Sequence, residues 1–182
     1  MFLNLNEIRD TREHVEEIYQ PDAFVGSDDG LDRDGLRVVA PVSLGFDIFR
    51  DDEQFHLVGM LRGRVQLQCG RCLEPFEYPV VTTFDLRYVP RAANTGEGER
   101  EIEEDDLTTA FYEDDRIDLG HLMREQIYLA LPMKPLCRDL CQGLCPECGT
   151  NRNTGTCDCK HEWDDPRFAA LKALRDDEAK RH

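Results

Sequence analysis

The sequence predicts an α+β fold in which an antiparallel β meander or half-barrel carries a cysteine-rich C-terminal segment and short helices. Apolar and polar residues alternate with period two over three long stretches of the first half. Six of the eight cysteines gather between residues 137 and 159. A chain of 182 residues with 40% hydrophobic content can bury one core, so we expect one domain in three parts. These parts are an antiparallel β region (1–91), an acidic flexible loop and connector (92–116), and a helix, cysteine knuckle and C-terminal helix packed on the β region (117–182).

The three alternating stretches predict half-buried antiparallel strands, joined by turn-like segments at 50–53 and 70–75. Residues 10–21 are ambiguous, because Asp10 and Glu13 fit the capping box of a helix, whereas Val15, Glu17 and Tyr19 alternate as in a strand. The apolar members of the three stretches are Val42, Leu44, Phe46 and Ile48; Leu61, Val65, Leu67 and Cys69; and Phe76, Tyr78, Val80, Phe84, Leu86 and Tyr88.

Residues 92–106 hold a dense run of carboxylates and almost no apolar side chains. Like-charged segments of this kind stay solvated, which predicts a mobile loop. The alternative is an acidic tether that grips a basic partner.

Two segments have helical periodicity. Residues 118–132 predict a helix that Asp118 caps and Pro132 ends, with one apolar stripe of Leu119, Leu122, Met123 and Ile127. A second helix is expected near the C-terminus, with Asp164 or Asp165 as cap, Pro166 in the first turn, and Phe168, Leu171 and Leu174 facing inward.

The cysteines indicate metal binding rather than disulfides. No apolar run approaches the length of a membrane span, and the N-terminal residues carry charges where a signal peptide needs an apolar stretch. We therefore expect a cytoplasmic protein. Thiols stay reduced in the cytoplasm, so closely spaced cysteines there favour a metal site.

The segment CPECG, residues 145–149, has the form of a zinc knuckle. Its two intervening residues let both thiolates reach one tetrahedral ion, and Gly149 lets the backbone fold over it. A second pair follows after an eight-residue loop. The first predicted zinc site therefore consists of Cys145, Cys148, Cys157 and Cys159.

The other four cysteines predict a second site. One pair has knuckle spacing and the other has the spacing of one helical turn. This site consists of Cys69, Cys72, Cys137 and Cys141. A rival partition places Cys137, Cys141, Cys145 and Cys148 on one ion, and spacing does not choose between them. The expected cofactor is zinc, as one or two ions, so the expected fold includes a zinc-bound Cys-rich C-terminal segment.

No enzymatic centre is expected. A catalytic zinc keeps an open position beside a general base, whereas thiolates here are numerous enough to close every site. His121 is expected on the helix surface or in packing, and His161 is an alternative ligand in place of Cys159. Cys69 and Cys72 have the spacing of a thiol–disulfide couple, but the strand–helix alternation that usually accompanies it is lacking.

The formal net charge of −16 disfavours non-specific nucleic-acid binding by the whole surface, because such affinity comes largely from Lys and Arg. A basic protein suits such a surface better. The alternative is that the acidity only keeps the protein in solution.

Four segments, in this order, resemble the YceD-like family of bacterial and plastid proteins: CGRCLEPFEYPV (69–80), IDLGHLMREQIYLALPMKPLC (117–137), GLCPECGTN (143–151) and DPRFAAL (165–171). The resemblance covers most of the chain after about Val38. It implies a factor needed for the accumulation of large-subunit ribosomal RNA. In bacteria the gene commonly lies next to that of a zinc-ribbon protein of the large ribosomal subunit. Arg152 stands where relatives often carry Leu.

Two functions of different classes are therefore expected. The first is an assembly factor that binds a basic ribosomal protein or pre-ribosomal particle through its acidic surface, with zinc holding the C-terminal region rigid. The second is direct RNA recognition by a local basic patch of Arg62, Arg64, Arg71, Lys134, Arg138, Arg152 and Lys160. The net charge favours the first. A third reading is a zinc-stabilised interaction module unrelated to ribosomes.

Overall fold

The computed structural model describes residues 1–25, 36–91 and 108–159. The chain forms two compact units: a larger one of residues 1–70 and 74–139, and a smaller one of residues 71–73 with 140–182. Several expectations lie outside the described residues: those for the acidic loop (92–106), for Lys160 and His161, and for the C-terminal helix that begins at Asp164 or Asp165.

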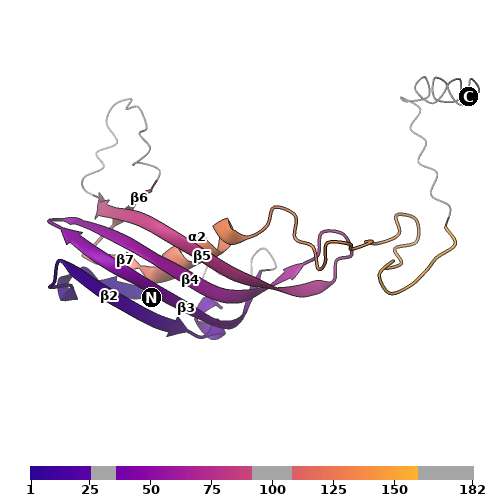
Figure 1. The fold of residues 1–182 in the computed structure, drawn as a ribbon, viewed down its shortest axis with the longest axis horizontal. Helices are drawn as coiled ribbons and strands as arrows, with labels where there is room; N and C mark the ends of the chain where they lie inside the picture. The colour runs from indigo at the N-terminus through magenta and orange to yellow at the C-terminus, as the bar shows by residue number, and fades with distance from the viewer. Residues whose placement is uncertain (26–35, 92–107, 160–182) are drawn as a thin grey trace, which may run out of the picture. The chain divides into compact units, whose positions relative to one another are not determined.

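The main sheet of the larger unit has five strands in the order β2-β3-β4-β5-β6 (Figure 1). The strands are β2 (Arg12–Tyr19), β3 (Arg37–Asp51), β4 (Gln54–Gln68), β5 (Pro75–Pro90) and β6 (Thr109–Tyr112). The first four strands form three antiparallel pairs, β2 with β3, β3 with β4 and β4 with β5, which confirms the predicted antiparallel meander for this part of the sheet. β6 pairs parallel with β5, so the sheet as a whole is mixed.

The ambiguous N-terminal segment is a strand, and Asp10 and Glu13 do not cap a helix. β2 pairs with β3 from Arg12 opposite Phe49 to Tyr19 opposite Val42. Val15 and Tyr19 pack against the core, as the period-two pattern predicts. The period of two therefore prevails here over the helix-capping signal.

Gly59 of β4 stands opposite Phe46 of β3, where the structure leaves no room for a side chain. A methyl group at Gly59 would lie 2.4 Å from the Cβ of Phe46 and 2.5 Å from the carbonyl oxygen of Gly45. At Gly45, by contrast, an added Cβ meets nothing within 4 Å. Gly59 is therefore required by space, whereas Gly45 is not.

Two short strands were not predicted: one lies within the expected connector (92–116), and the other begins at the last residue of that connector. They are β6 and β7 (Arg116–Asp118), and β7 pairs antiparallel with β1 (Phe2–Asn4) in a second sheet. The turn between β6 and β7 is closed by the Arg116 N–H, which donates to the Glu113 carbonyl at 3.0 Å. Its central residues, Asp114 and Asp115, have φ values of 52° and 54°.

The predicted helix is α2 (Leu119–Ala130), and the Asp118 carboxylate caps it by accepting from the N–H groups of Gly120 at 2.8 Å and His121 at 3.1 Å. Its apolar stripe belongs to one hydrophobic core, together with the inward side chains of the sheet and the buried residues of the short 3₁₀ turns η1 (Leu5–Glu7) and η2 (Pro21–Phe24). The buried stripe is the predicted one: Leu119, Leu122, Met123 and Ile127. In the described part of the chain, no helix is both long enough and apolar enough to cross a membrane.

Candidate metal centres

The smaller unit is organised around the knuckle that begins at Cys145. The Cys145 N–H donates to the Thr150 carbonyl at 2.8 Å, and the Gly149 N–H donates to the Cys145 carbonyl at 2.9 Å. Gly149 has φ = 73°, while a Cβ there would meet nothing within 4 Å. The turn therefore needs glycine for its backbone conformation and not for space. An isolated bridge between Leu144 and Asn151 closes the base of the knuckle.

The structure brings together the sulfur atoms of one predicted group. These atoms all lie within 4.8 Å of one another, and they belong to Cys145, Cys148, Cys157 and Cys159. Cys145 is buried and Cys148 is exposed. The rival partition, which joins Cys137 and Cys141 to Cys145 and Cys148, is not the grouping formed among the described residues.

Hydrogen bonds prepare two of these thiols to ionise. The backbone N–H groups of Cys148 and Glu147 donate to the Cys145 sulfur and lower the pKa of Cys145 to about 6. The hydroxyl and the N–H of Thr150 lower the pKa of Cys148. Thiolate is the form of cysteine that binds metal, so these bonds favour the metal-binding form of the first pair.

In the metal-free protein the pKa values of the second pair, Cys157 and Cys159, are raised and not lowered. The side chain of Cys145 raises the pKa of Cys157, and the side chain of Cys148 raises the pKa of Cys159 to about 12. The metal-free cluster thus keeps protons on one pair because four adjacent thiolates would repel one another. A divalent cation can replace those protons, which is the chemistry of a tetrathiolate site.

Three polar residues that the sequence pattern did not assign to the sites contact the cysteine sulfur atoms. The guanidinium of Arg152 donates to the Cys145 sulfur at 3.8 Å, and this hydrogen bond raises the pKa of Arg152. The Thr150 hydroxyl lies 3.1 Å from the Cys148 sulfur, and the Asn153 amide donates to the Cys141 sulfur at 3.3 Å. The run TNRNT at 150–154, directly after the knuckle, is the signal that could have revealed them.

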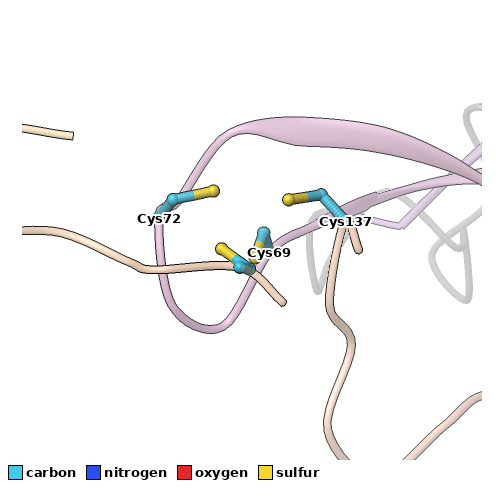
Figure 2. Close-up of side chains that lie close together, drawn as sticks. Cys69, Cys72 and Cys137 are labelled. Atoms are coloured by element: carbon cyan, nitrogen blue, oxygen red, sulfur yellow. The ribbon is translucent and has the colours of Figure 1, made fainter. Parts of the chain in front are cut away.

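The sulfur atoms of the other predicted group also lie within 4.8 Å of one another. They belong to Cys69, Cys72, Cys137 and Cys141. Figure 2 shows the sulfur atoms of Cys72 and Cys137 pointing toward each other beside Cys69. Three of these cysteines are buried and Cys137 is half-buried.

Backbone contacts hold the segments that carry this group. The Cys69 N–H donates to the Glu74 carbonyl at 3.0 Å, and the Gly70 N–H donates to the Pro135 carbonyl at 2.8 Å. In the smaller unit, the Arg71 guanidinium donates to the Cys141 carbonyl at 2.9 Å. The first of these hydrogen bonds is local, whereas the other two join residues far apart in the sequence.

His121 lies outside both sulfur groups. It is exposed on α2, with its Nδ1 atom 3.9 Å from the Glu125 carboxylate. Its expected place on the helix surface is confirmed.

The residues of the predicted basic patch have different surroundings. Arg62 and Arg64 are exposed on β4, but Arg64 pairs with Glu77 at 3.1 Å. Lys134 and Arg138 are exposed in the segment that follows α2. The guanidinium groups of Arg71 and Arg152 are engaged at the cysteine clusters, as described above.

Comparison with known proteins gives relatives but no structural match. A family model described as "Large ribosomal RNA subunit accumulation protein YceD" matches residues 57–175. The chain is 28% identical to the "Large ribosomal RNA subunit accumulation protein YCED homolog 1, chloroplastic" of Zea mays, over 71% of this chain and 52% of the relative. It is 27% identical to the protein of the same name in Arabidopsis thaliana, over 75% of this chain and 49% of the relative. It is also 27% identical to the "Uncharacterized protein YlbN" of Bacillus subtilis, over 79% and 81% of the two chains.

The chain spans about half the length of the two plant relatives. No solved structure matches it.

Proposed function

This chain belongs to the YceD family, described as large ribosomal RNA subunit accumulation proteins, and we propose that it supports this accumulation without catalysis by binding a basic ribosomal protein or a precursor particle. The observation that carries the choice of partner is the net charge of −16. A surface of this sign attracts a basic protein and repels phosphate over the range of the molecule's field.

The described residues include an acidic surface suited to such a partner. The β3–β4 and β6–β7 turns line a cleft of about 830 Å³. Asp52 and Glu53 come from the first turn, and Asp114 and Asp115 from the second. Arg91, in the same wall, is paired with Glu113 at 2.6 Å. The cleft therefore presents more negative than positive charge to solvent.

We propose that zinc is held by both cysteine groups. Each group offers four sulfur donors, which fits the closed tetrahedral coordination of a structural zinc. The lowered pKa values of Cys145 and Cys148 support thiolate ligation at the knuckle. Bound zinc would supply folding free energy to the smaller unit, whose described residues form no helix or long strand.

A zinc ion enclosed by four thiolates has no open position for a substrate, and this supports a role without catalysis. Reduced thiols are stable in the cytoplasm, which is where we place the protein. Direct RNA binding is the less favoured function, because Arg64, Arg71 and Arg152 already have partners within the protein.

The test is affinity purification of the tagged protein at low and high salt, with and without RNase. We expect capture of a basic ribosomal protein or precursor particle that survives RNase and weakens as salt rises, because exposed charge pairs are screened within about 10 Å at roughly 0.1 M salt. In cells depleted of the protein, mature large-subunit ribosomal RNA should fall relative to small-subunit RNA. An unchanged ratio would remove the link to the ribosome. Capture that RNase abolishes, together with tight binding to naked RNA, would favour the RNA-binding alternative.

A further inference from the structure

Strand β2 forms one edge of the main sheet. One side of the strand pairs with β3 along all eight residues, and no described strand pairs with the other side. An open edge of this length offers a row of backbone N–H and C=O groups to any extended chain. Such an edge is a template for the addition of a strand from a partner.

Hydrogen bonding identifies the residues whose backbone groups face outward. The Arg50 N–H donates to the Thr11 carbonyl at 3.0 Å, one position before the pair Arg12–Phe49 in the same register. Facing residues of an antiparallel ladder alternate between pairs that exchange hydrogen bonds and pairs that do not. Since Thr11 and Arg50 form a bonded pair, Glu13, Val15 and Glu17 also bond to β3. The N–H and C=O groups that point to the open edge are those of Arg12, His14, Glu16 and Ile18.

The side chains along this edge carry a net negative charge. Arg12 and His14 both contact the Asp47 carboxylate at 3.0 Å, and this carboxylate offsets the positive charge of Arg12. Glu13, Glu16 and Glu17 add three carboxylates along the strand, and Glu17 also accepts from the Tyr19 hydroxyl. Ile18 is 67% exposed at the end of the same row.

We propose that the open edge of β2 receives a lysine- or arginine-rich extended segment of the partner, which adds to the main sheet as a further strand. This rests on the proposed function, because it names the surface that holds the basic partner. The backbone groups of the four outward-facing residues would supply the hydrogen bonds, and the glutamates would select basic side chains over acidic ones. A second copy of this chain fits less well, because its own glutamates would oppose those of the first.

The test uses three synthetic peptides of eight residues, the length of β2. The first alternates Lys and Val, the second is the same peptide methylated on every backbone nitrogen, so that neither of its edges can donate, and the third carries Glu in place of Lys. We expect the first to bind and to slow amide hydrogen exchange at His14, Glu16 and Ile18 by about tenfold or more. The methylated peptide keeps every charge but loses the edge hydrogen bonds, so it should bind at least about tenfold more weakly. The acidic peptide should not bind.

Variants at Glu16 test the same edge in the full chain. Glu16→Pro removes an N–H that the sheet does not use, and proline is tolerated on edge strands at such positions. It should lower the affinity for the first peptide and for the captured partner while the melting temperature changes little. Glu16→Lys keeps the N–H and reverses the charge, so it should also weaken binding of the first peptide and of the captured partner. This variant replaces Glu16→Pro in the test if the proline variant is unstable. Glu17→Pro is the control for fold, because it removes an N–H bonded to β3 and should lower the melting temperature.

Equal binding of the methylated and unmethylated peptides would overturn the proposal, since attraction would then be purely electrostatic. Unchanged exchange at the outward amides, or slowing that depends on protein concentration without peptide, would also overturn it; the latter would identify a second copy as the occupant. If the basic partner still binds both Glu16 variants normally, the edge proposal fails and the proposed function stands. If the peptide protects β2 but no basic ribosomal protein is captured, the proposed function fails and β2 remains a peptide-binding edge.

Discussion

Replacing Cys145 with serine is expected to remove zinc from the knuckle and leave the other cysteine group loaded. Cys145 is 2% exposed, and its sulfur accepts from the backbone N–H groups of Cys148 and Glu147, which lower its pKa to about 6. A serine hydroxyl does not ionise at neutral pH, so the site would keep three thiolates. Four-ligand structural zinc sites bind with about 10–16 kcal/mol, so one ligand contributes about 3 kcal/mol, or roughly a hundredfold in affinity.

The assay is zinc content after dialysis against a moderate chelator, followed by competition titration with a chromophoric chelator. Zinc should fall from about two ions per chain to about one. Arg152→Leu is the milder variant, because it removes a contact with the Cys145 sulfur and leaves all four thiolates in place. It should lower the zinc affinity of the knuckle by about tenfold. Thr156→Ser, at an exposed position of the same loop, is the control and should change neither the zinc content nor the zinc affinity. Two tightly held zinc ions in Cys145→Ser would refute the assignment of Cys145 as a ligand.

Three further measurements test the fold and the metal-free cluster. Gly59→Ala should lower the free energy of unfolding by about 2 kcal/mol, or the Tm by roughly 4–8 °C, because the new Cβ would lie 2.4 Å from the Cβ of Phe46. Gly45→Ala is the control and should leave the Tm unchanged. Equal melting curves for the two variants would contradict the close approach at Gly59. Asp118→Ala should cost about 1 kcal/mol by urea unfolding through loss of the α2 cap, and Asp118→Asn should restore most of it; no difference between them would argue against capping. In zinc-stripped protein near neutral pH, iodoacetamide should modify Cys148 faster than Cys159, whose pKa is about 12, and mass spectrometry that finds the reverse order would contradict the hydrogen bonding. Because the pKa of Cys148 is lowered by folding, its stabilising contribution to the metal-free protein is present above the ordinary thiol pKa and is lost as pH falls through the lowered value.

Local patterns predicted the parts of the fold that have long, regular periodicity. The alternation around Val42–Ile48 and Leu61–Leu67 became β3 and β4, and the stripe from Leu119 to Ile127 became the buried face of α2. The short strands were not predicted, because four residues in β6 and three in β7 are too few to show a period. They are defined by pairing with distant strands, which a local pattern does not record.

The cysteine pairs could be recognised from spacing, but the way the pairs combine could not. The five residues of CPECG are enough to predict a knuckle. The closeness of the Cys69 and Cys137 sulfur atoms, in contrast, depends on long-range contacts such as the hydrogen bond from the Gly70 N–H to the Pro135 carbonyl. The supporting roles of Arg152 and Asn153 were missed for the same reason. Arg152 contacts a sulfur seven positions earlier in the chain, and only the folded loop shows it.

The turn between β6 and β7 carries two carboxylates at positions whose backbone conformation favours glycine. Asp114 and Asp115 occupy adjacent left-handed conformations, where Asn-Gly is the favoured pair of a two-residue hairpin turn. A glycine at the second position would relieve about 1 kcal/mol of backbone strain. The chain instead keeps two carboxylates at the lip of the acidic cleft. The substitution Asp115→Gly should therefore raise the thermal stability while it removes one negative charge from the cleft. A homologue that does not use the cleft could carry glycine at this position and gain the more stable turn.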